Sequence, residues 1–338
     1  MAGITHLEEF SDESLQGIVD ESVKNAVPTL ADQFLPTVET FDRKFMYYIV
    51  KNSPFIAGYI GGGAEPQIVD RNEMADRHVE LAQFGLRHVL TYEELQAINH
   101  SRFKEEAKSA IDRTLIDTIN LVEGTQRLIQ LAKLDALMKG QHEVKGKGIR
   151  FTYDFGIPDE NKVALTTGND FDTEDFDIIG FLMDQVQAYE DENGQTPTML
   201  VSRELNAKML RNSQLITEVG RPAGSTRISQ EELNTVLDSF GLPVPTIIKQ
   251  RHIAYKDNST GQAVQREFMP VNRIVMLGEG IGEYKLGPTL ENNFQPGIKV
   301  EAKDKDEPIR SIITTYGAGF PVVENPFLIR HIDAYTPV

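Results

Sequence analysis

The sequence of 338 residues contains no cysteine, which excludes disulfides, thiolate chemistry and cysteine-ligated metals. It also has no apolar run close to the ~20 residues that a membrane-spanning helix needs. Basic residues are few, with 34 Lys and Arg against 51 Asp and Glu, so the formal net charge is -17. This balance disfavours nucleic acid as a partner over the whole surface and predicts no specific nucleic-acid sequence, because phosphate binding needs clustered cations. The start, MAGITHLEEFSDESL, lacks the basic and apolar regions of a signal peptide, so we expect a soluble, intracellular product without a membrane partner.

Catalytic and metal-binding motifs are missing as well. The seven histidines show no HExxH or other paired ligand spacing, and RPAGSTR (221–227) contains a serine without the G-x-S-x-G elbow. NDFDTEDFD (169–177) has carboxylates at alternate residues, but Asp175 stands where a calcium loop needs Gly and Phe181 where it needs Glu. An acidic first turn of a helix is the better interpretation of that stretch. We therefore expect no catalytic residue and no metal ligand.

Two glycine-rich stretches raise the question of a nucleotide site. In IVMLGEGIGEYKLG (274–287), Gly278 and Gly280 fit a dinucleotide fingerprint, but Glu283 occupies the third glycine position. A strand, rather than a phosphate-binding helix, is predicted to follow. GYIGGGAEP (58–66) lacks the Lys and Ser/Thr of a phosphate loop. Both stretches predict turns or strand tips, and we expect no cofactor.

The remaining pattern predicts an α+β fold. Apolar residues spaced near 3.6 and the absence of proline predict one helix over 104–138, about 50 Å long and ended by Gly140. Gly124, in the middle of this helix, marks either a bending point or close packing against a strand. Capping boxes place two further helix starts at Thr91–Glu94 and Ser229–Glu232.

Strand patterns dominate the second half of the chain. Alternation over 149–165 predicts a hairpin. Helices are expected at about 174–192 and after Ser202, and a mixed sheet over 195–325 with strands at 198–201, 245–255, 272–277, 282–286 and 309–323. Ile274 and Met276 on one face, with Val275 and Leu277 on the other, predict an inner strand buried on both sides.

The N-terminal part of the sequence is predicted to make contacts with partners. Residues 1–45 are acidic with scattered apolar positions, which predicts an arm with one short amphipathic helix that docks on another body. Residues 45–59 and the segment through Phe84 and Val89 predict a long two-stranded excursion. Its tip carries GGG (61–63) and the charged stretch 70–80, and such a long polar tip suggests a partner.

Two stretches resemble a known family. EFMPVNRIVMLGEG (267–280), followed by GPTLE, and PIRSIITTYGAGFPVVENPFLIRHIDA (308–334) resemble the C-terminal half of lambda-like major capsid proteins of tailed phages. The element order of the whole chain is similar to the HK97-like capsid fold. The resemblance implies four parts: an N-terminal arm (1–45), an extended loop or E-loop (46–92), a peripheral domain with spine helix and hairpin (93–168, completed by 320–338), and an axial domain with a mixed sheet (169–319).

The resemblance also implies a function. It implies a structural, non-enzymatic subunit that assembles into hexamers and pentamers of an icosahedral phage head around double-stranded DNA. Such a protein would be made in the host cytoplasm and reside in the virion. The expected partners are further copies of the chain, a separate scaffolding protein, a portal protein and a decoration protein. The residues expected at contacts between subunits are Tyr59, Arg71, Glu73, Asp76, Arg77 and Arg221.

Two alternatives stay open at this point. One is an α+β enzyme whose catalytic residues form no recognisable motif. The other is a non-viral encapsulating shell protein with the same fold.

Overall fold

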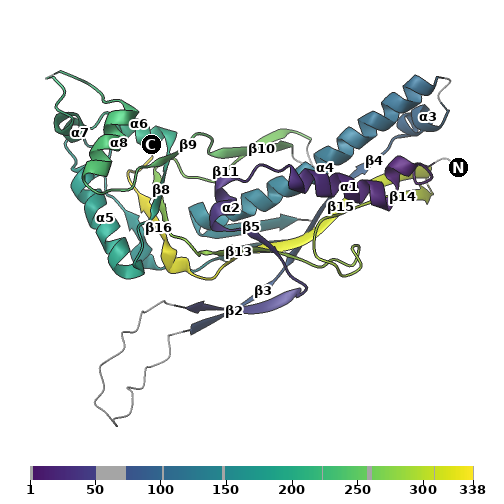
Figure 1. Cartoon of the computed structure of the whole chain (residues 1–338), viewed down its shortest axis with the longest axis horizontal. Coiled ribbons are helices and arrows are strands. Elements are labelled where there is room, and N and C mark those ends of the chain that lie inside the picture. Colours follow the sequence, from purple (N-terminus) through teal and green to yellow (C-terminus); the bar gives the residue numbers. More distant parts are fainter. Residues whose placement is uncertain are drawn as a thin grey trace, which may run out of the picture. The chain divides into compact units, whose positions relative to one another are not determined.

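The computed structural model describes residues 3–50, 74–100, 103–146, 149–222, 224–256, 261–307 and 309–337. Helices and strands alternate in mixed order, which confirms the α+β class (Figure 1). The chain forms two compact units, each assembled from separate stretches. Unit 1 comprises Met1–Phe45, Val79–Lys133 and Glu283–Val322, and unit 2 comprises Met46–His78, Leu134–Gly282 and Val323–Val338.

The sheet of unit 1 is organised around one long strand. β15 (Ile309–Val323) pairs antiparallel with β14 (Lys299–Asp306) and with β4 (Ala82–Val89). The order along the rest of the sheet is β1 (Thr37–Glu39), β13 (Gly282–Gly287), β15, β14, with β1 parallel to β13. The strands that pair come from the start, the first third and the end of the chain, so long-range pairing defines this unit.

The helices of unit 1 begin where the sequence supplies caps. α1 (Asp12–Lys24) starts at Ser11, whose side chain accepts from Ser14 N–H, and α2 (Leu30–Phe34) follows it. α3 (Tyr92–His100) starts with the predicted capping box at Thr91. The long helix is confirmed as α4 (Lys104–Lys139), and most of its length belongs to unit 1. Apolar side chains from these helices and from the sheet form one core: Ile4, Phe10, Leu15, Val19, Leu90, Leu95, Ile98, Val122, Ile129, Ala132, Tyr284, Leu286, Ile298, Val300 and Ile313.

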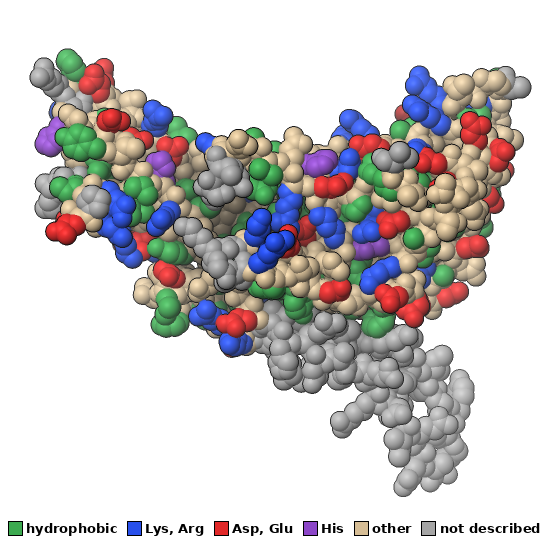
Figure 2. All heavy atoms as spheres, turned by 180° about the vertical axis from the view of Figure 1, so that it is seen from behind, with side chains coloured by type: hydrophobic (Ala, Val, Ile, Leu, Met, Phe, Trp, Pro, Cys, Tyr) green, Lys and Arg blue, Asp and Glu red, His purple; other side chains and the backbone are tan. Residues whose placement is uncertain are grey.

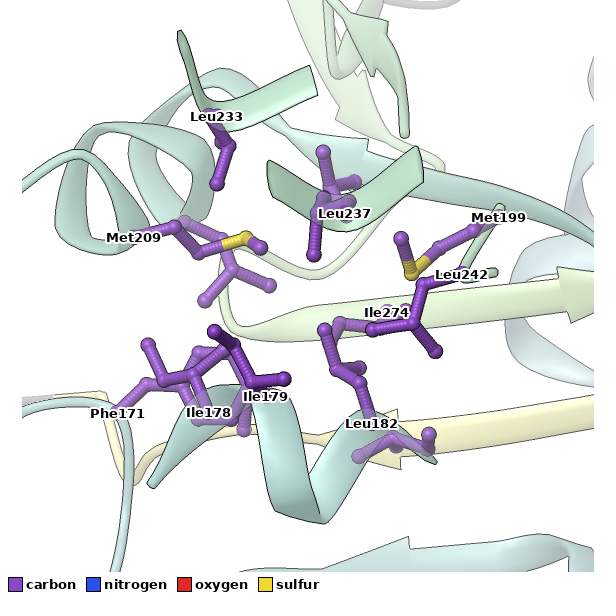
Figure 3. Close-up of a cluster of buried hydrophobic side chains, with 14 of the residues drawn as sticks. Phe171, Ile178, Ile179, Leu182, Met199, Met209, Leu233, Leu237, Leu242 and Ile274 are labelled. Carbon is purple, nitrogen blue, oxygen red and sulfur yellow. The ribbon is translucent and has the colours of Figure 1, made fainter. Parts of the chain in front are cut away.

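Unit 2 has its own sheet and helices. The sheet order is β7 (Lys162–Ala164), β16 (Ile329–Asp333), β12 (Arg273–Leu277), β8 (Thr198–Ser202), β9 (Thr246–Ile248). Four helices accompany it: α5 (Ile178–Asn193), α6 (Arg203–Met209), α7 (Ser213–Glu218) and α8 (Gln230–Ser239). Their apolar faces and the sheet share a core to which Ile178, Leu182, Met209, Leu237 and Ile274 contribute (Figure 3).

The inner-strand prediction for β12 is confirmed. Its four apolar residues, Ile274 to Leu277, are fully buried, and the strand lies between β16 and β8. The helix starts at Ser202 and Ser229 are confirmed too, since each hydroxyl accepts a backbone N–H of the first turn. Gly140 ends α4 in a left-handed conformation, with φ of +69°, as its position predicted.

Three two-stranded sheets complete the fold. They are β2 (Lys44–Val50) with β3 (Met74–Glu80), β5 (Gln141–Gly146) with β6 (Ile149–Asp154), and β10 (His252–Lys256) with β11 (Ala263–Glu267). Within the described part of the chain, no helix has a stretch both long and apolar enough to cross a bilayer.

Several predicted pairings are wrong. The hairpin expected over 149–165 does not form, because β6 turns back onto β5, whereas β7 runs parallel to β16. The strand expected over 245–255 is two strands, β9 and β10, in different sheets. Residues 195–325 do not share one mixed sheet, since β12 belongs to the sheet of unit 2 and β13 to the sheet of unit 1. Local alternation marks a strand but carries no information about its partner.

The predicted excursion is also shorter than expected. Residues 82–89 form β4, a strand of the unit 1 sheet, rather than the returning half of a free loop. The paired part of the excursion is β2 with β3, and residues 51–73 lie outside the described residues.

Candidate assembly surfaces

The N-terminal segment packs on its own unit. Ile4, Phe10, Leu15 and Val19 are buried in the core of unit 1, and α1 packs against β14. The prediction that this arm docks on another body is therefore wrong for these residues. The apolar positions are too few to form a core alone, but they complete a core supplied by the rest of the unit.

A buried lysine fixes the end of this segment. Lys133 on α4 has no exposed side-chain surface, and its Nζ donates to Asp32 Oδ1 at 2.5 Å and to Thr37 Oγ1 at 2.8 Å. Gln130 Nε2 donates to the same carboxylate at 3.0 Å. Lys133 Nζ also lies 5.6 Å from the centroid of the Tyr284 ring. We call Asp32, Thr37, Gln130, Lys133 and Tyr284 the Lys133 cluster.

The pKa values in the Lys133 cluster follow from burial and pairing. Burial by itself raises the pKa of Asp32, but the hydrogen bond from Lys133, with those from Thr29 and Gln130, outweighs it, so the pKa falls below 3.8. Burial lowers the pKa of Lys133, and Asp32 only partly opposes this. Pairing with Lys133 thus favours the charged form of Asp32, whereas burial of Lys133 favours its neutral form.

A second carboxylate holds the beginning of the chain. Asp304 on β14 accepts from the N–H groups of Ile4 and Thr5 at 3.2 Å, from Thr5 Oγ1 at 2.5 Å and from Ser311 Oγ at 2.5 Å. Burial opposes ionisation here as well, but the hydrogen bonds from Ser311, Thr5 and Ile4 lower the pKa of Asp304 below 3.8. One charged side chain thus satisfies two backbone amides just before the first turns of the chain.

The seam between α4 and the sheet of unit 1 is lined by hydroxyl groups and a glycine. The buried hydroxyl of Thr315 on β15 lies 3.2 Å from that of Thr125 on α4 and bonds to the backbone of Leu86 on β4. A Cβ added at Gly124 would lie 2.8 Å from Leu86 Cδ1. The glycine therefore permits close packing of α4 on β4, which is the simpler of the two roles predicted for it.

The glycine turn after β12 is a strand-to-strand connection. Gly280 adopts φ of +79°, and a Cβ at Gly278 would lie 2.5 Å from the Tyr189 hydroxyl. The predicted turn is confirmed, although the strands that it joins belong to different sheets. β13 follows directly, so the turn does not lead into a helix as a dinucleotide-binding turn would.

A pocket of about 280 Å³ lies beside this turn. Its lining includes the carboxylates of Glu192 and Glu279 and the amides of Asn193, Gln195 and Asn325. The lining itself includes no basic side chain, and Arg330 is already paired with Glu192, its Nη2 lying 3.2 Å from Glu192 Oε2. A phosphate in this pocket would therefore meet the Glu279 carboxylate and a cation already bound to Glu192. The geometry thus disfavours a nucleotide at the place where the sequence first suggested one.

The acidic stretch 169–177 precedes its helix instead of starting it. α5 begins at Ile178 with Asp177 as its N-cap, accepting from Gly180 N–H at 2.9 Å, so the expected acidic first turn is wrong. Asp170 is buried and accepts from Asp172 N–H and from the Thr173 hydroxyl at 3.2 Å. The carboxylates of the stretch 169–177 thus accept local hydrogen bonds that stabilise turns and the start of α5. In the described ranges, no group of three or more His, Asp or Glu is placed to hold a metal ion.

The predicted contact residues are only partly placed by the structure. Tyr59, Arg71 and Glu73 lie outside the described residues, and Asp76 and Arg77 belong to β3. Arg221 is exposed, and its Nη2 lies 2.6 Å from Glu232 Oε1. The hydrogen bond to Arg221 lowers the pKa of Glu232. The role of these predicted residues at contacts between subunits stays a prediction.

Sequence reasoning missed the residues that hold the N-terminal segment. Lys133 lies in LAKLDALMK, between apolar residues at helical spacing, and a lysine on the apolar face of a predicted helix is the one signal available. Asp304 lies in a run of alternating charges, KDKD, that looks like any solvated strand edge. Figure 2 shows basic and acidic side chains interspersed over the face that it draws, without a large region of one sign.

Comparisons with known proteins point in one direction. A sequence model of a family described as phage major capsid protein E matches residues 19–287. No curated protein sequence matches the chain.

Solved structures that share the fold include the following two. A protein described as a capsid protein of a prophage of E. coli CFT073 has a TM-score of 0.61 at 12% identity, covering 95% of this chain and 98% of that one. A phage-related protein of Bordetella bronchiseptica RB50 has a TM-score of 0.53 at 11% identity, covering 95% and 97%. The HK97-like capsid fold expected from the sequence is confirmed.

Proposed function

The chain belongs to the phage major capsid protein E family, and we propose that its copies form hexamers and pentamers of an icosahedral head that encloses double-stranded DNA. It is a structural subunit of a phage capsid. The family match over residues 19–287 is the observation that carries the proposal. The net charge of -17 supports it, because an acidic shell protein can enclose DNA at high density without adhering to it.

The proposed role needs no catalysis. The family and the structural neighbours are capsid proteins. The pocket beside the glycine turn carries two carboxylates and no nucleophile next to a base. An α+β enzyme without a recognisable motif and a non-viral encapsulating shell are therefore the less favoured alternatives.

The proposed division of labour follows the capsid fold. Residues 1–45 form the N-terminal arm, 93–168 with 320–338 the peripheral domain, and 169–319 the axial domain. The extended loop, expected over 46–92, ends before β4, because β4 is paired with β15. The pairing of β2 with β3 and the length of α4 support an extended loop and a spine helix. We further propose that Tyr59, Arg71, Glu73, Asp76, Arg77 and Arg221 lie at contacts between subunits.

The proposed partners follow from the function. Copies of the chain bind one another, a separate scaffolding protein shapes the shell, and portal and decoration proteins complete the head. The protein resides in the virion after synthesis in the host cytoplasm.

Purified full-length protein viewed by electron microscopy tests this function. We expect closed shells, alone or with the scaffolding protein of the same phage. A variant in which residues 70–77 are replaced by a short Gly-Ser turn should remain soluble and fail to close shells. Single particles without shells under all conditions would refute the proposed function, and normal shells from the shortened variant would refute the contact role of 70–77.

A further inference from the structure

β4 leaves one backbone edge without a partner. Among the strands that the structure describes, it pairs with β15 alone. Leu90 N–H donates to Ser311 O and Leu86 N–H bonds to the Thr315 hydroxyl, so the even-numbered residues direct their backbone groups towards β15. The odd-numbered residues Gln83, Gly85 and Arg87, with Val89, therefore direct theirs outward.

Among the described residues, these outward groups have no partner. Within the described ranges, no hydrogen bond reaches the backbone N–H or C=O of Gln83, Gly85, Arg87 or Val89. All four residues are exposed. Just before β4, the same edge is already hydrogen-bonded to another stretch of backbone, since Leu81 N–H donates to Arg43 O at 3.1 Å. Four N–H and four C=O groups at alternate residues are the pattern that an added strand satisfies.

The strand carries little protection against such pairing. Edge strands of soluble proteins are normally short, or blocked by proline, charges or a covering element. β4 has eight residues without proline, and Arg87 is the one charged side chain among its outward residues. An open edge of this length would promote aggregation if it stayed unpaired.

We propose that an extended segment of a second copy of this chain adds to the outer edge of β4 as a further strand. The inference rests on the proposed function, since assembly brings copies together. Every subunit presents one such edge, and the chain itself supplies matching segments in equal number. Charge favours this occupant too: the outward residues include a cation and no carboxylate, whereas the chain as a whole carries -17.

Hydrogen–deuterium exchange tests the proposal on wild-type protein. In unassembled subunits the amides of Gln83, Gly85, Arg87 and Val89 should exchange quickly, and in shells of the purified chain they should slow by about 100-fold or more, as added ladder hydrogen bonds require. Leu86 and His88 should be protected in both states. Shells in which the outward amides still exchange quickly would overturn the proposal alone.

Proline at an outward position gives a second test. Arg87→Pro removes a free N–H at a sheet edge, where proline is tolerated, so the subunit should fold with a nearly unchanged melting temperature. We expect its yield of shells to fall at least about tenfold. Arg87→Ala, which keeps the N–H and removes the charge, should assemble nearly as well as wild type. His88→Pro, which removes an inward N–H, should instead destabilise the subunit.

The outcomes separate the two hypotheses. Normal shells from a folded Arg87→Pro variant would overturn the strand addition while leaving the capsid function intact. Protection of the outward amides only after another phage protein is added would assign the edge to that protein and overturn the second copy as occupant. Failure of wild-type chain to form shells, alone or with its scaffolding protein, would refute the proposed function and the strand addition with it.

Discussion

The core of unit 2 and the N-terminal segment of unit 1 are held in place by different forces. The unit 2 core is formed mainly by apolar side chains, with Leu182, Met209 and Leu237 completely buried. The N-terminal segment also buries apolar side chains, but its two ends depend on the carboxylates of Asp32 and Asp304. The stabilisation that comes from burying apolar side chains does not depend on charged groups. A buried ion pair, by contrast, becomes destabilising when one of its two partners is removed. The segment is thus fixed by contacts that a single substitution can release.

The largest expected effect comes from removing one partner of the buried pair. Asp32→Ala leaves the ammonium of Lys133 buried without a carboxylate, and we expect the free energy of unfolding to drop by about 4 kcal/mol. Urea unfolding measures the change. The double variant Asp32→Leu with Lys133→Met should recover most of the loss, because it removes both charges and keeps apolar volume. Equal losses in the single and double variants would show that the charge is not the cause.

Acid should distinguish the two regions. Burial, with the nearby Arg273, lowers the pKa of His331 in unit 2 to about 4, and the hydrogen bond to Leu137 O opposes this only in part. The unfolded chain binds the proton more readily, so stability is lost as pH falls from 6.5 towards 4, by on the order of 3 kcal/mol. Asp32 and Asp304, whose pKa values lie below 3.8, keep their contribution over that range.

Unfolding curves at pH 7, 5.5 and 4.5 measure this difference. His331→Gln, which keeps a side-chain donor and cannot titrate, should flatten the pH dependence even if it is less stable at pH 7. Amide hydrogen exchange shows which region opens first as the pH falls. If the N-terminal segment loses its protection before the unit 2 core does, the expected order of acid sensitivity is wrong.

A smaller effect is expected at the start of the chain. Asp304→Asn removes the charge that the N–H groups of Ile4 and Thr5 share, at a cost of about 1.5 kcal/mol. Hydrogen exchange of the Ile4 and Thr5 amides should become faster because their charged acceptor is lost. Because asparagine keeps the shape of the side chain, we expect no effect on the core of unit 2. Leu182→Ala is the matched control, and it should destabilise unit 2 without freeing these amides.

The smallest effect concerns Gly124. Alanine favours the helix by about 1 kcal/mol, but its methyl group would displace the end of the Leu86 side chain. We expect the two terms nearly to cancel, with a change in melting temperature of a few degrees at most. The combination Gly124→Ala with Leu86→Val should be more stable than Leu86→Val alone. If α4 must bend when an assembled shell changes size, shells of the Gly124→Ala variant should be unable to change size. That result would support the role of Gly124 as a bending point.

The sequence was most informative where structure is local. α4 followed from 3.6-residue spacing without proline, and three capped starts, at Thr91, Ser202 and Ser229, followed from their side chains. Pairing was not predictable, because β7 meets β16 more than 160 residues away and no local pattern encodes that partner. The burial of the N-terminal segment was missed for the same reason: its few apolar residues are completed by distant strands.

The seam at Thr315 has a mechanical consequence. Over residues 312–316, β15 is paired with β14 on one side and β4 on the other, and the Thr315 hydroxyl also meets α4. Tension along β15 loads these antiparallel hydrogen bonds together in shear rather than breaking them one at a time from an end. In the proposed head, a wall that contains compressed DNA would be under outward pressure, so each subunit would have to transmit tension. Because several hydrogen bonds must break at once, this part of the subunit resists stretching more than any one of those bonds could.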